Sequence, residues 1–365
     1  MKFSSARSSF AEALSIVVRA VAARSSFQAL EGVHITAKDG ELILCGYNLE
    51  IGIVSRCEAE VASEGSAVVS AKFLSDIIRK LPGDRISFST DANGNSSISS
   101  GIAKFELAAM TEEDYPDLPA TDDEESFTVP SDIIKLMIAG TVFSASLSEI
   151  KPVQTGVLFD FKGDTVRAAA TDNSRLAVRT EKVNGMNADS RFVINANTLR
   201  EIDRIMRPGE SVKVCVSKKH ASLEFADIRV VARLLEGEFY KFENALLATQ
   251  PYSLTVDTDV FSDCVDRVSL LVDEKIRRCI RFTFGSGMIS MVFNSPVGKA
   301  YDECACEGEA PDTEMGLNNR FLLDVLKAVG DSRIKLCFAS GRSPIVIRPV
   351  EGEAYFYMIA PVHIT

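Results

Sequence analysis

Apolar residues recur at helical spacing in three segments of the chain that resemble one another. In each segment, hydrophobic side chains stand three or four positions apart, glycine with or without proline follows, and the next residues alternate between apolar and polar. The first spacing places apolar side chains on one face of a helix, glycine and proline end helices, and alternation is typical of a strand. The pattern predicts a helix followed by a strand at 72–88, 197–216 and 320–338.

A second pattern returns at a similar interval. The chain begins with a short strand-like stretch and a helical stripe, and similar stretches start at Phe127 and Ser253. Each predicts a strand followed by a helix, and Pro130-Ser131-Asp132 and Asp257 supply residue types that commonly start helices. Two patterns that share one period of about 120 residues indicate a duplicated domain. The alternative is a coincidence between ordinary α+β segments, which the shared period disfavours.

These repeats predict an α+β fold of three domains, at 1–122, 123–248 and 249–365. The boundaries are expected in an acidic, proline-rich stretch at 114–126 and near 245–253. A chain of 365 residues, of which 46% are hydrophobic, is also long enough for more than one core. No apolar run reaches the length of a membrane helix, so no contact with a membrane is expected.

The charge of the chain is unevenly distributed. The formal net charge is −11, which argues against a general nucleic-acid binder. The six predicted helices are nevertheless weakly basic together, so the remainder is more acidic than the whole chain. If the helices shared one surface, that surface could face phosphates through long, solvated, sequence-independent contacts. Exposed helix faces are also commonly charged, and charge alone leaves both interpretations open.

Nothing in the sequence indicates a cofactor, a metal site or catalysis. Without a secretion signal, the eight cysteines are expected to be free, buried thiols in a cytoplasmic protein. Cys304 and Cys306 form a C-x-C, but the three scattered histidines do not complete a set of metal ligands. The chain also lacks phosphate-loop, dinucleotide, zinc-protease and serine-hydrolase motifs. Acidic clusters at 112–114 and 122–125 are interpreted as solvated loops.

Several further segments, taken in order, resemble the bacterial DNA sliding clamp, the beta subunit of DNA polymerase III holoenzyme. The resemblance covers essentially the whole chain, and its landmarks are DGELILCGYNLEIGI, AKFLSDIIRKLPG, FELAAMTEEDYPDLP, TGVLFDFKGDTVRAAATDNSRLAV, RLLEGEFYKFENAL, DEKIRRCIRFTF, FLLDVLKAV and YFYMIAPVHI. The family implies three clamp domains per chain, each with two helices on antiparallel sheets. Two chains then join head to tail as a homodimer, in a closed ring of six domains around duplex DNA.

The implied function is that of a processivity factor. Such a ring is not an enzyme, and it tethers the replicative polymerase, the clamp loader and other clamp-motif proteins to DNA. Two alternatives remain: a diverged clamp paralogue that acts as a protein-interaction scaffold without productive DNA loading, and an enzyme built on a triplicated fold.

The resemblance implies a groove between the second and third domains that binds short partner peptides carrying a glutamine and hydrophobic anchors. Carried over to this chain, it would be formed by Thr171, Asn173, Ser174, Arg175, Leu176, Ala245, Leu246, Pro344, Met358, Ile359, Ala360, Pro361 and Val362. The alternatives are a tight turn in which Asp172 satisfies backbone amides, and an apolar tail that is ordinary core. Asn173-Ser174 stands where the family usually has Gly-His, a difference that concerns peptide preference.

The resemblance also implies contacts with DNA and with a second subunit. The DNA-facing candidates are Arg7, Arg24, Lys72, Arg79, Lys80, Arg200, Arg204 and Lys327, of which Arg24 matches a family position and the others are chosen for their location on helices. At the dimer interface, an edge strand near Lys104 is expected to meet one near 301–307 of the other chain. The interface candidates are Lys72, Lys104, Phe105, Leu270, Leu271, Glu307 and Glu309, with Glu314 as a further acidic partner. For Phe105, an inward core position is the alternative.

Overall fold

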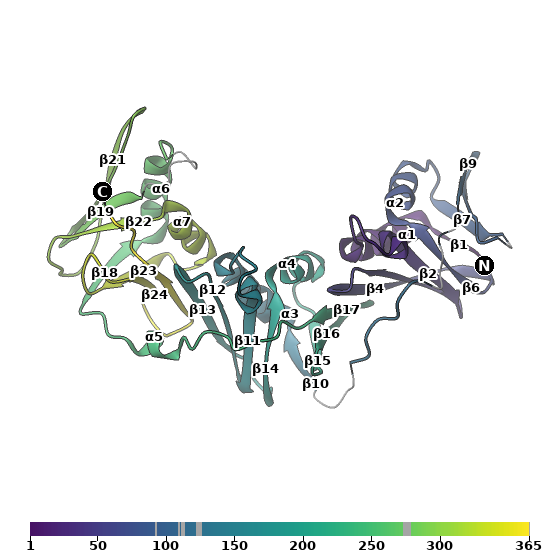
Figure 1. The fold of residues 1–365 in the computed structure, drawn as a ribbon, viewed down its shortest axis with the longest axis horizontal. Helices are drawn as coiled ribbons and strands as arrows, with labels where there is room; N and C mark the ends of the chain where they lie inside the picture. The colour runs from purple at the N-terminus through teal and green to yellow at the C-terminus, as the bar shows by residue number, and fades with distance from the viewer. Residues whose placement is uncertain (92, 109, 111–113, 122–125, 273–278, 365) are drawn as a thin grey trace. The chain divides into compact units, whose positions relative to one another are not determined.

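The computed structural model describes residues 1–91, 93–108, 110, 114–121, 126–272 and 279–364 (Figure 1). The acidic residues predicted as loops at 112–113 and 122–125 lie outside these ranges. The chain divides into two compact units. The first comprises Met1–Asp132 and Arg200–Leu234, and the second comprises Ile133–Leu199 and Leu235–Thr365.

The first unit contains a five-stranded and an eight-stranded antiparallel sheet. The smaller sheet has the order β5 (Glu60–Ser63), β1 (Lys2–Ala6), β7 (Arg85–Thr90), β8 (Ser96–Ser100) and β9 (Ala103–Leu107). The larger has the order β10 (Ser126–Pro130), β15 (Ser211–Val216), β16 (His220–Phe225), β17 (Ile228–Arg233), β4 (Ile51–Glu58), β3 (Glu41–Tyr47), β2 (Gly32–Lys38) and β6 (Gly65–Ser70). Helices α1 (Arg7–Val17) and α2 (Ala71–Lys80) pack against each other in this unit (Figure 1).

The second unit contains an eight-stranded and a four-stranded antiparallel sheet. The larger has the order β14 (Ala188–Asn195), β11 (Gly156–Gly163), β12 (Thr165–Thr171), β13 (Arg175–Lys182), β25 (Tyr355–Ile359), β24 (Ile345–Pro349), β23 (Arg333–Phe338) and β18 (Tyr252–Asp257). The smaller has the order β21 (Gly298–Ala305), β20 (Met288–Ser295), β19 (Ile280–Gly285) and β22 (Thr313–Leu317). Helices α6 (Thr258–Ser269) and α7 (Asn319–Ala328) pack against each other, and the short α5 (Glu243–Leu247) precedes β18.

The predicted helix–strand pairs are confirmed in all three repeats. The first pattern forms α2 and β7, then α4 (Ala196–Ile205) and β15, then α7 and β23. The second forms β1 and α1, then β10 and α3 (Ser131–Ala139), then β18 and α6. The third position of each segment is a leucine, and Leu74, Leu199 and Leu322 are each at most 1% exposed. The predicted apolar face of each helix is therefore its buried face.

The helix-start residues behave differently in two of the repeats. In α6, the Asp257 carboxylate accepts a hydrogen bond from the Val260 amide at 3.0 Å, which is an N-cap as predicted. Helix α3 also begins at Ser131, but the side chains of Ser131 and Asp132 accept hydrogen bonds from the Glu210 and Gly209 amides, each at 3.0 Å. These two side chains therefore fix the turn that follows α4.

Each eight-stranded sheet joins strands from two of the predicted repeats. Strand β17 pairs with β4 in the first unit, with Val231 opposite Gly52. Strand β13 pairs with β25 in the second unit, with Leu176 opposite Met358. The sequence repeats are therefore linked through backbone ladders as well as through the chain.

The thiols are free as predicted, although not every one of them is buried. All eight cysteines are free, and six of them are buried. Burial raises the pKa of the Cys45 thiol to about 11 and that of Cys304 to about 12. Within the described ranges, none of the helices combines the length and the apolar character that a membrane span requires.

Candidate functional site

The candidate groove rests on a hydrophobic cluster in the second unit. Its buried members are Leu158, Ala169, Leu176, Val178, Val193, Phe239, Phe242, Cys337, Val346 and Phe356. Partly buried apolar side chains pack on these, and they are Val153, Leu235, Ala245, Leu246 and Met358. The result is an apolar surface on a closed floor, which suits the anchor side chains of a peptide. Four of the predicted groove residues, Leu176, Ala245, Leu246 and Met358, come together here.

Strand register explains which residues of β25 reach this cluster. Met358 lies opposite Leu176 of β13 and Val346 of β24, so the three share one face of the sheet. The next residue, Ile359, points to the other face, is fully buried and belongs to a separate cluster with the α6 and α7 side chains. Beyond the strand, the Ala360 amide donates to the Ser174 carbonyl at 2.8 Å, which places the tail beside the β12–β13 turn.

The β12–β13 turn has the geometry proposed as the alternative for this segment. Asp172 Oδ1 accepts hydrogen bonds from the Ser174 and Arg175 amides at 2.9 and 3.0 Å. The buried Thr171 hydroxyl donates to the Arg175 carbonyl at 2.8 Å. Asn173 adopts a left-handed φ of 71°, which asparagine tolerates better than most residues. Asn173 and Ser174 are consequently exposed at the tip of a fixed turn.

Arg175 is held inside the protein by several partners. Its guanidinium donates to Asp172 Oδ2 at 3.1 Å, to Asp324 Oδ2 of α7 at 2.6 Å and to the Phe143 carbonyl. It also stacks over the Phe321 ring, with 4.2 Å between the guanidinium carbon and the ring centroid. The side chain is only 11% exposed. Arg175 therefore ties the turn to α7, whereas the family resemblance assigned it to the peptide groove.

Sequence reasoning missed residues that support the groove from outside the predicted set. Val153, in the 3₁₀ turn η5 (Pro152–Thr155), and Leu235 add apolar surface to the cluster. The Arg348 guanidinium donates to the Leu246 carbonyl at 3.2 Å and lies 4.8 Å from the centroid of the Phe356 ring. Leu235 stands within the RLLEGEF landmark, which could have indicated it. Val153 and Arg348 stand in segments without a comparable signal in the sequence.

The other predicted groove residues lie around this surface. Pro344 is half-buried just before β24, and Pro361 is half-buried beyond β25. Val362 is 40% exposed, and its amide donates to the Gly316 carbonyl at 2.8 Å. A hollow of about 530 Å³ adjoins the cluster, with Leu158, Val193 and Phe239 on its walls. Its rim carries charged side chains, which are Arg191, Glu238, Lys241 and Glu243.

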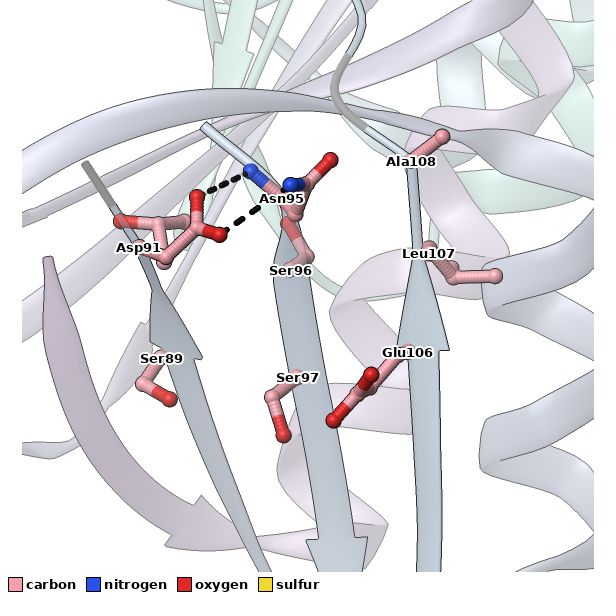
Figure 2. Close-up of a pocket in the computed structure, with 9 residues that line it drawn as sticks. Ser89, Asp91, Asn95, Ser96, Ser97, Glu106, Leu107 and Ala108 are labelled. Carbon is pink, nitrogen blue, oxygen red and sulfur yellow. Dashed lines mark hydrogen bonds between the residues drawn. The ribbon is translucent and has the colours of Figure 1, made fainter. Parts of the chain in front are cut away.

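A second hollow, of about 520 Å³, lies in the first unit at the ends of β7, β8 and β9 (Figure 2). Its lining is mainly polar, with Ser89, Ser97 and Glu106 on the three strands. The Asp91 carboxylate accepts hydrogen bonds from the amide and the side chain of Asn95 at 2.8 and 3.1 Å, and these bonds hold the pKa of Asp91 below its usual value. None of the predicted site residues lines this hollow.

The candidate DNA-facing residues are mostly exposed, and two of them pair with acids on their own helix. Arg79 contacts Asp76 in α2, and Arg204 contacts Glu201 in α4, each three positions away. The half-buried Arg7 donates to the Gly83 carbonyl at 2.9 Å. The pKa of the half-buried Arg200 is lowered by burial and by the neighbouring Arg204 charge. The exposed residues are Arg24, Lys72, Arg79, Lys80, Arg204 and Lys327.

The candidate interface residues lie on sheet edges or on exposed surface. Strands β9 and β21 each stand at the end of their sheet. Phe105 of β9 is 40% exposed, which excludes the inward core position that was its alternative, and Leu270 is 80% exposed. Leu271 is half-buried against the core of the second unit.

Two of the charged candidates at these edges form ion pairs within the chain, and the others are exposed. Lys104 Nζ lies 2.8 Å from Glu106, and Glu307 lies 2.5 Å from Arg333. Glu309, Glu314 and Lys72 are exposed.

Comparison with known proteins identifies the family. Residues 1–119, 128–241 and 247–363 match the N-terminal, central and C-terminal domains of the DNA polymerase III beta subunit. The chain is 27% identical to the beta sliding clamp of Staphylococcus epidermidis, and 99% of each chain is covered. The sliding clamp of Bacillus subtilis superposes with a TM-score of 0.97 at 26% identity over 100% of both chains. A putative beta subunit from Eubacterium rectale gives 0.95 at 27% identity over 99% of both.

The chain belongs to the DNA polymerase III beta subunit family of bacterial sliding clamps. This confirms the predicted family and its α+β fold of repeated clamp domains. The family is one of polymerase processivity factors, and the matches favour that function over a scaffold without DNA loading.

Proposed function

We propose that two copies of this chain join head to tail into a ring that encircles duplex DNA and tethers a replicative polymerase, without catalytic activity of its own. The observation that carries the proposal is the match of three consecutive clamp-domain models along one chain. The packing of α1 on α2 and of α6 on α7 supports it, because both terminal repeats pair their helices in the same way. The matched ranges also support domain boundaries near 1–122, 123–248 and 249–365.

The proposed partner site is the apolar surface around Leu246 and Met358. A partner peptide would place hydrophobic anchors on these half-buried side chains, while the β12–β13 turn and the tail beyond β25 form the polar edge. The buried side chains beneath form a packed floor on which such anchors could rest.

The proposed subunit contact pairs β9 of one copy with β21 of the other. Each strand ends its sheet, so one side of it has no neighbouring strand among the described residues. Phe105 and Leu270 offer exposed apolar surface close to these edges, and burying it would add a hydrophobic contribution. Lys72 and Lys104 would meet acidic residues of the partner copy, which tunes the register of the contact more than its strength.

The proposed DNA contacts are long basic side chains on helices. Lys72 and Lys80 on α2 and Lys327 on α7 are exposed, as is Arg24 in the loop after α1. Such contacts read no sequence and are screened by salt, which suits a ring that slides.

The deciding experiment is retention on DNA of defined topology. The chain is loaded onto nicked circular duplex DNA with a clamp loader and ATP, and the complex is separated by gel filtration. We expect the protein to remain with the circle and to leave once a restriction enzyme linearises it. A monomer in solution that never stays on the circle contradicts the ring and supports the scaffold alternative.

A further inference from the structure

Two buried thiols meet where α6 packs on β21. Cys264 of α6 is 1% exposed and Cys304 of β21 is 5% exposed, and both belong to the core cluster of the second unit. The Cys264 sulfur lies 3.6 Å from the carbonyl oxygen of Glu303, the residue before Cys304. The two thiols are also close enough to share a hydrogen bond. Their sulfurs are therefore neighbours, although they stand in different elements.

The spacing of residues along each element explains this contact. In β21, Asp302 and Cys304 stand two positions apart and point to the same face. Cys304 lies opposite the fully buried Ile289 of β20, so that face is turned toward the core. In α6, Cys264 and Arg267 stand three positions apart and share one side of the helix. A thiol and a charged side chain of the helix thus meet a thiol and a charged side chain of the strand.

Arg267 connects the pair of thiols to the surface. Its Nε donates to Asp302 Oδ2 at 2.7 Å, and a terminal nitrogen of the same guanidinium donates to the Cys264 sulfur at 3.2 Å. The Arg267 side chain is 57% exposed. The Cys264 sulfur therefore lies directly beneath a side chain that reaches solvent, and a small oxidant can approach the sulfur when this contact opens.

The surroundings of the two thiols limit their ionisation but favour one of them. Burial raises the pKa of the Cys304 thiol to about 12. Burial and the Asp302 carboxylate raise the pKa of Cys264, whereas the Arg267 charge lowers it. Because the thiolate is the nucleophile, both sulfurs react slowly at neutral pH. Cys264 supplies the first thiolate, since Arg267 places a cationic donor on its sulfur.

We propose that Cys264 and Cys304 form a modification site at which hydrogen peroxide produces an intrachain disulfide that links α6 to β21. Cys304 belongs to the C-x-C of the sequence, and the structure supplies Cys264 as its partner thiol. The inference does not depend on the proposed ring, although β21 is the strand proposed to meet a second copy.

The reaction takes two steps. The Cys264 thiolate attacks one oxygen of hydrogen peroxide, the O–O bond breaks and hydroxide leaves, which produces a sulfenic acid at Cys264. The Cys304 thiolate then attacks that sulfur, an S–S bond forms, and the S–O bond breaks as a second hydroxide leaves. The protons lost by the two thiols convert the hydroxides to water. Two thiols and one peroxide thus become one disulfide and two waters, and a dithiol reductant reverses the link.

The test maps disulfides in the reduced full chain after treatment with hydrogen peroxide under native conditions. Free thiols are blocked with N-ethylmaleimide, and proteolytic fragments are compared by mass spectrometry with and without dithiothreitol. We expect a pair of fragments linked through Cys264 and Cys304, lighter by two hydrogen atoms than the separate fragments and absent after reduction. Cys57 and Cys279 are half-buried and can also be oxidised, so the disulfide is the readout rather than the loss of thiols.

Two variants test the role assigned to Arg267, which is a positioning residue for the Cys264 thiolate. Arg267→Gln removes the cation and should slow formation of the disulfide at least about threefold. Arg267→Lys keeps a cation and should retain most of the wild-type rate. Equal slowing in both variants would contradict the electrostatic role of Arg267.

The matched control is the other cysteine of the C-x-C. Cys306 is 8% exposed, and its thiol donates to the Gly285 carbonyl at 3.3 Å. Cys306→Ala should form the link between Cys264 and Cys304 at a rate within about twofold of the wild type.

Three outcomes for the wild-type chain would overturn the inference. They are a disulfide between Cys304 and Cys306, a sulfinic acid at Cys264 with Cys304 still free, and oxidation of Cys57 or Cys279 without any linked fragment. Because the wild-type chain decides the question, a variant that folds poorly leaves the test intact.

Discussion

The residues around the candidate groove and the basic residues on the candidate DNA-facing helices hold their side chains in different ways. Around the groove, Arg175 and Gln154 are nearly buried and each is fixed by hydrogen bonds to defined partners. On α2, Lys80 is exposed and makes no ion pair within the described part of the chain, while Arg79 pairs with a neighbouring acid. Recognition of a peptide needs fixed geometry, whereas a sliding contact with phosphates needs only charge at the surface.

Removing the contacts between the β12–β13 turn and α7 should have the largest effect. Arg175→Ala leaves Asp172 and Asp324 without their shared cation and removes the stacking on Phe321. We expect the free energy of unfolding to fall by about 2–3 kcal/mol, less than for a fully buried pair because Asp324 is partly exposed. Affinity for a fluorescein-labelled peptide that carries a glutamine and hydrophobic anchors (the glutamine peptide) should fall at least about tenfold as the turn loosens.

Urea unfolding and peptide anisotropy measure the two effects. The control is Arg204→Ala, which removes an exposed helical pair and should change the free energy of unfolding by no more than about 0.5 kcal/mol. Equal stability of the two variants would mean that Arg175 is as dispensable as a surface charge.

The apolar floor of the groove gives the next largest effect. Leu246→Ala and Met358→Ala each remove a half-buried side chain on which a peptide anchor would rest. We expect each to weaken peptide binding by about five- to thirtyfold, which corresponds to about 1–2 kcal/mol of lost contact. Isothermal titration calorimetry with the glutamine peptide measures this change.

The neighbouring Leu247 is the matched control for the groove, because it lies on the same helix but is 80% exposed. Leu247→Ala should leave peptide affinity unchanged. A larger loss from Leu247→Ala than from Leu246→Ala would place the peptide on the opposite face of α5.

The candidate DNA contacts should respond weakly and unequally. Lys80→Gln removes a charge with no ion-pair partner among the described residues, and Arg79→Gln removes one already paired with Asp76. We expect Lys80→Gln to lower affinity for short linear duplex DNA about two- to threefold and to reduce the slope of log affinity against log salt by about one. Arg79→Gln should have the smaller effect in the same titrations, and the reverse order would show that the Asp76 pair does not neutralise Arg79.

The smallest effect expected is that of salt on peptide binding. An apolar surface with neutral amides at its edge releases no counterions, so raising the salt from about 0.05 M to about 0.3 M should change peptide affinity less than about twofold. DNA affinity measured across the same range should fall steeply. A steep salt dependence for the peptide would indicate that charged contacts dominate the groove.

Local patterns in the sequence were sufficient to predict the repeats. Helix faces and stops depend on neighbours a few positions apart, and the aligned leucines Leu74, Leu199 and Leu322 are buried as that spacing requires. The joining of repeats through β17–β4 and β13–β25 was not predictable in this way. A strand's alternation tells which face is buried but not which distant strand it pairs with.

The candidate site was predictable only through resemblance, and only in part. Leu246 and Met358, which the family pattern assigned to a partner groove, are half-buried and pack on one apolar cluster. Gln154 was not predicted, because a single polar residue in a 3₁₀ turn produces no periodic pattern in the sequence. Arg175 was assigned to the groove, but its burial was not predicted because it depends on Asp324, which is 149 residues away in the sequence.

The open edges of β9 and β21 have a consequence for the chain before it assembles. Each edge presents backbone groups that an extended segment of another molecule could use as a template. A contact between unlike edges can also repeat from copy to copy, and it closes only if the rotation between copies returns the last edge to the first. A small change of twist in either strand would therefore turn the same contact into a growing filament, which makes strand twist a determinant of solubility.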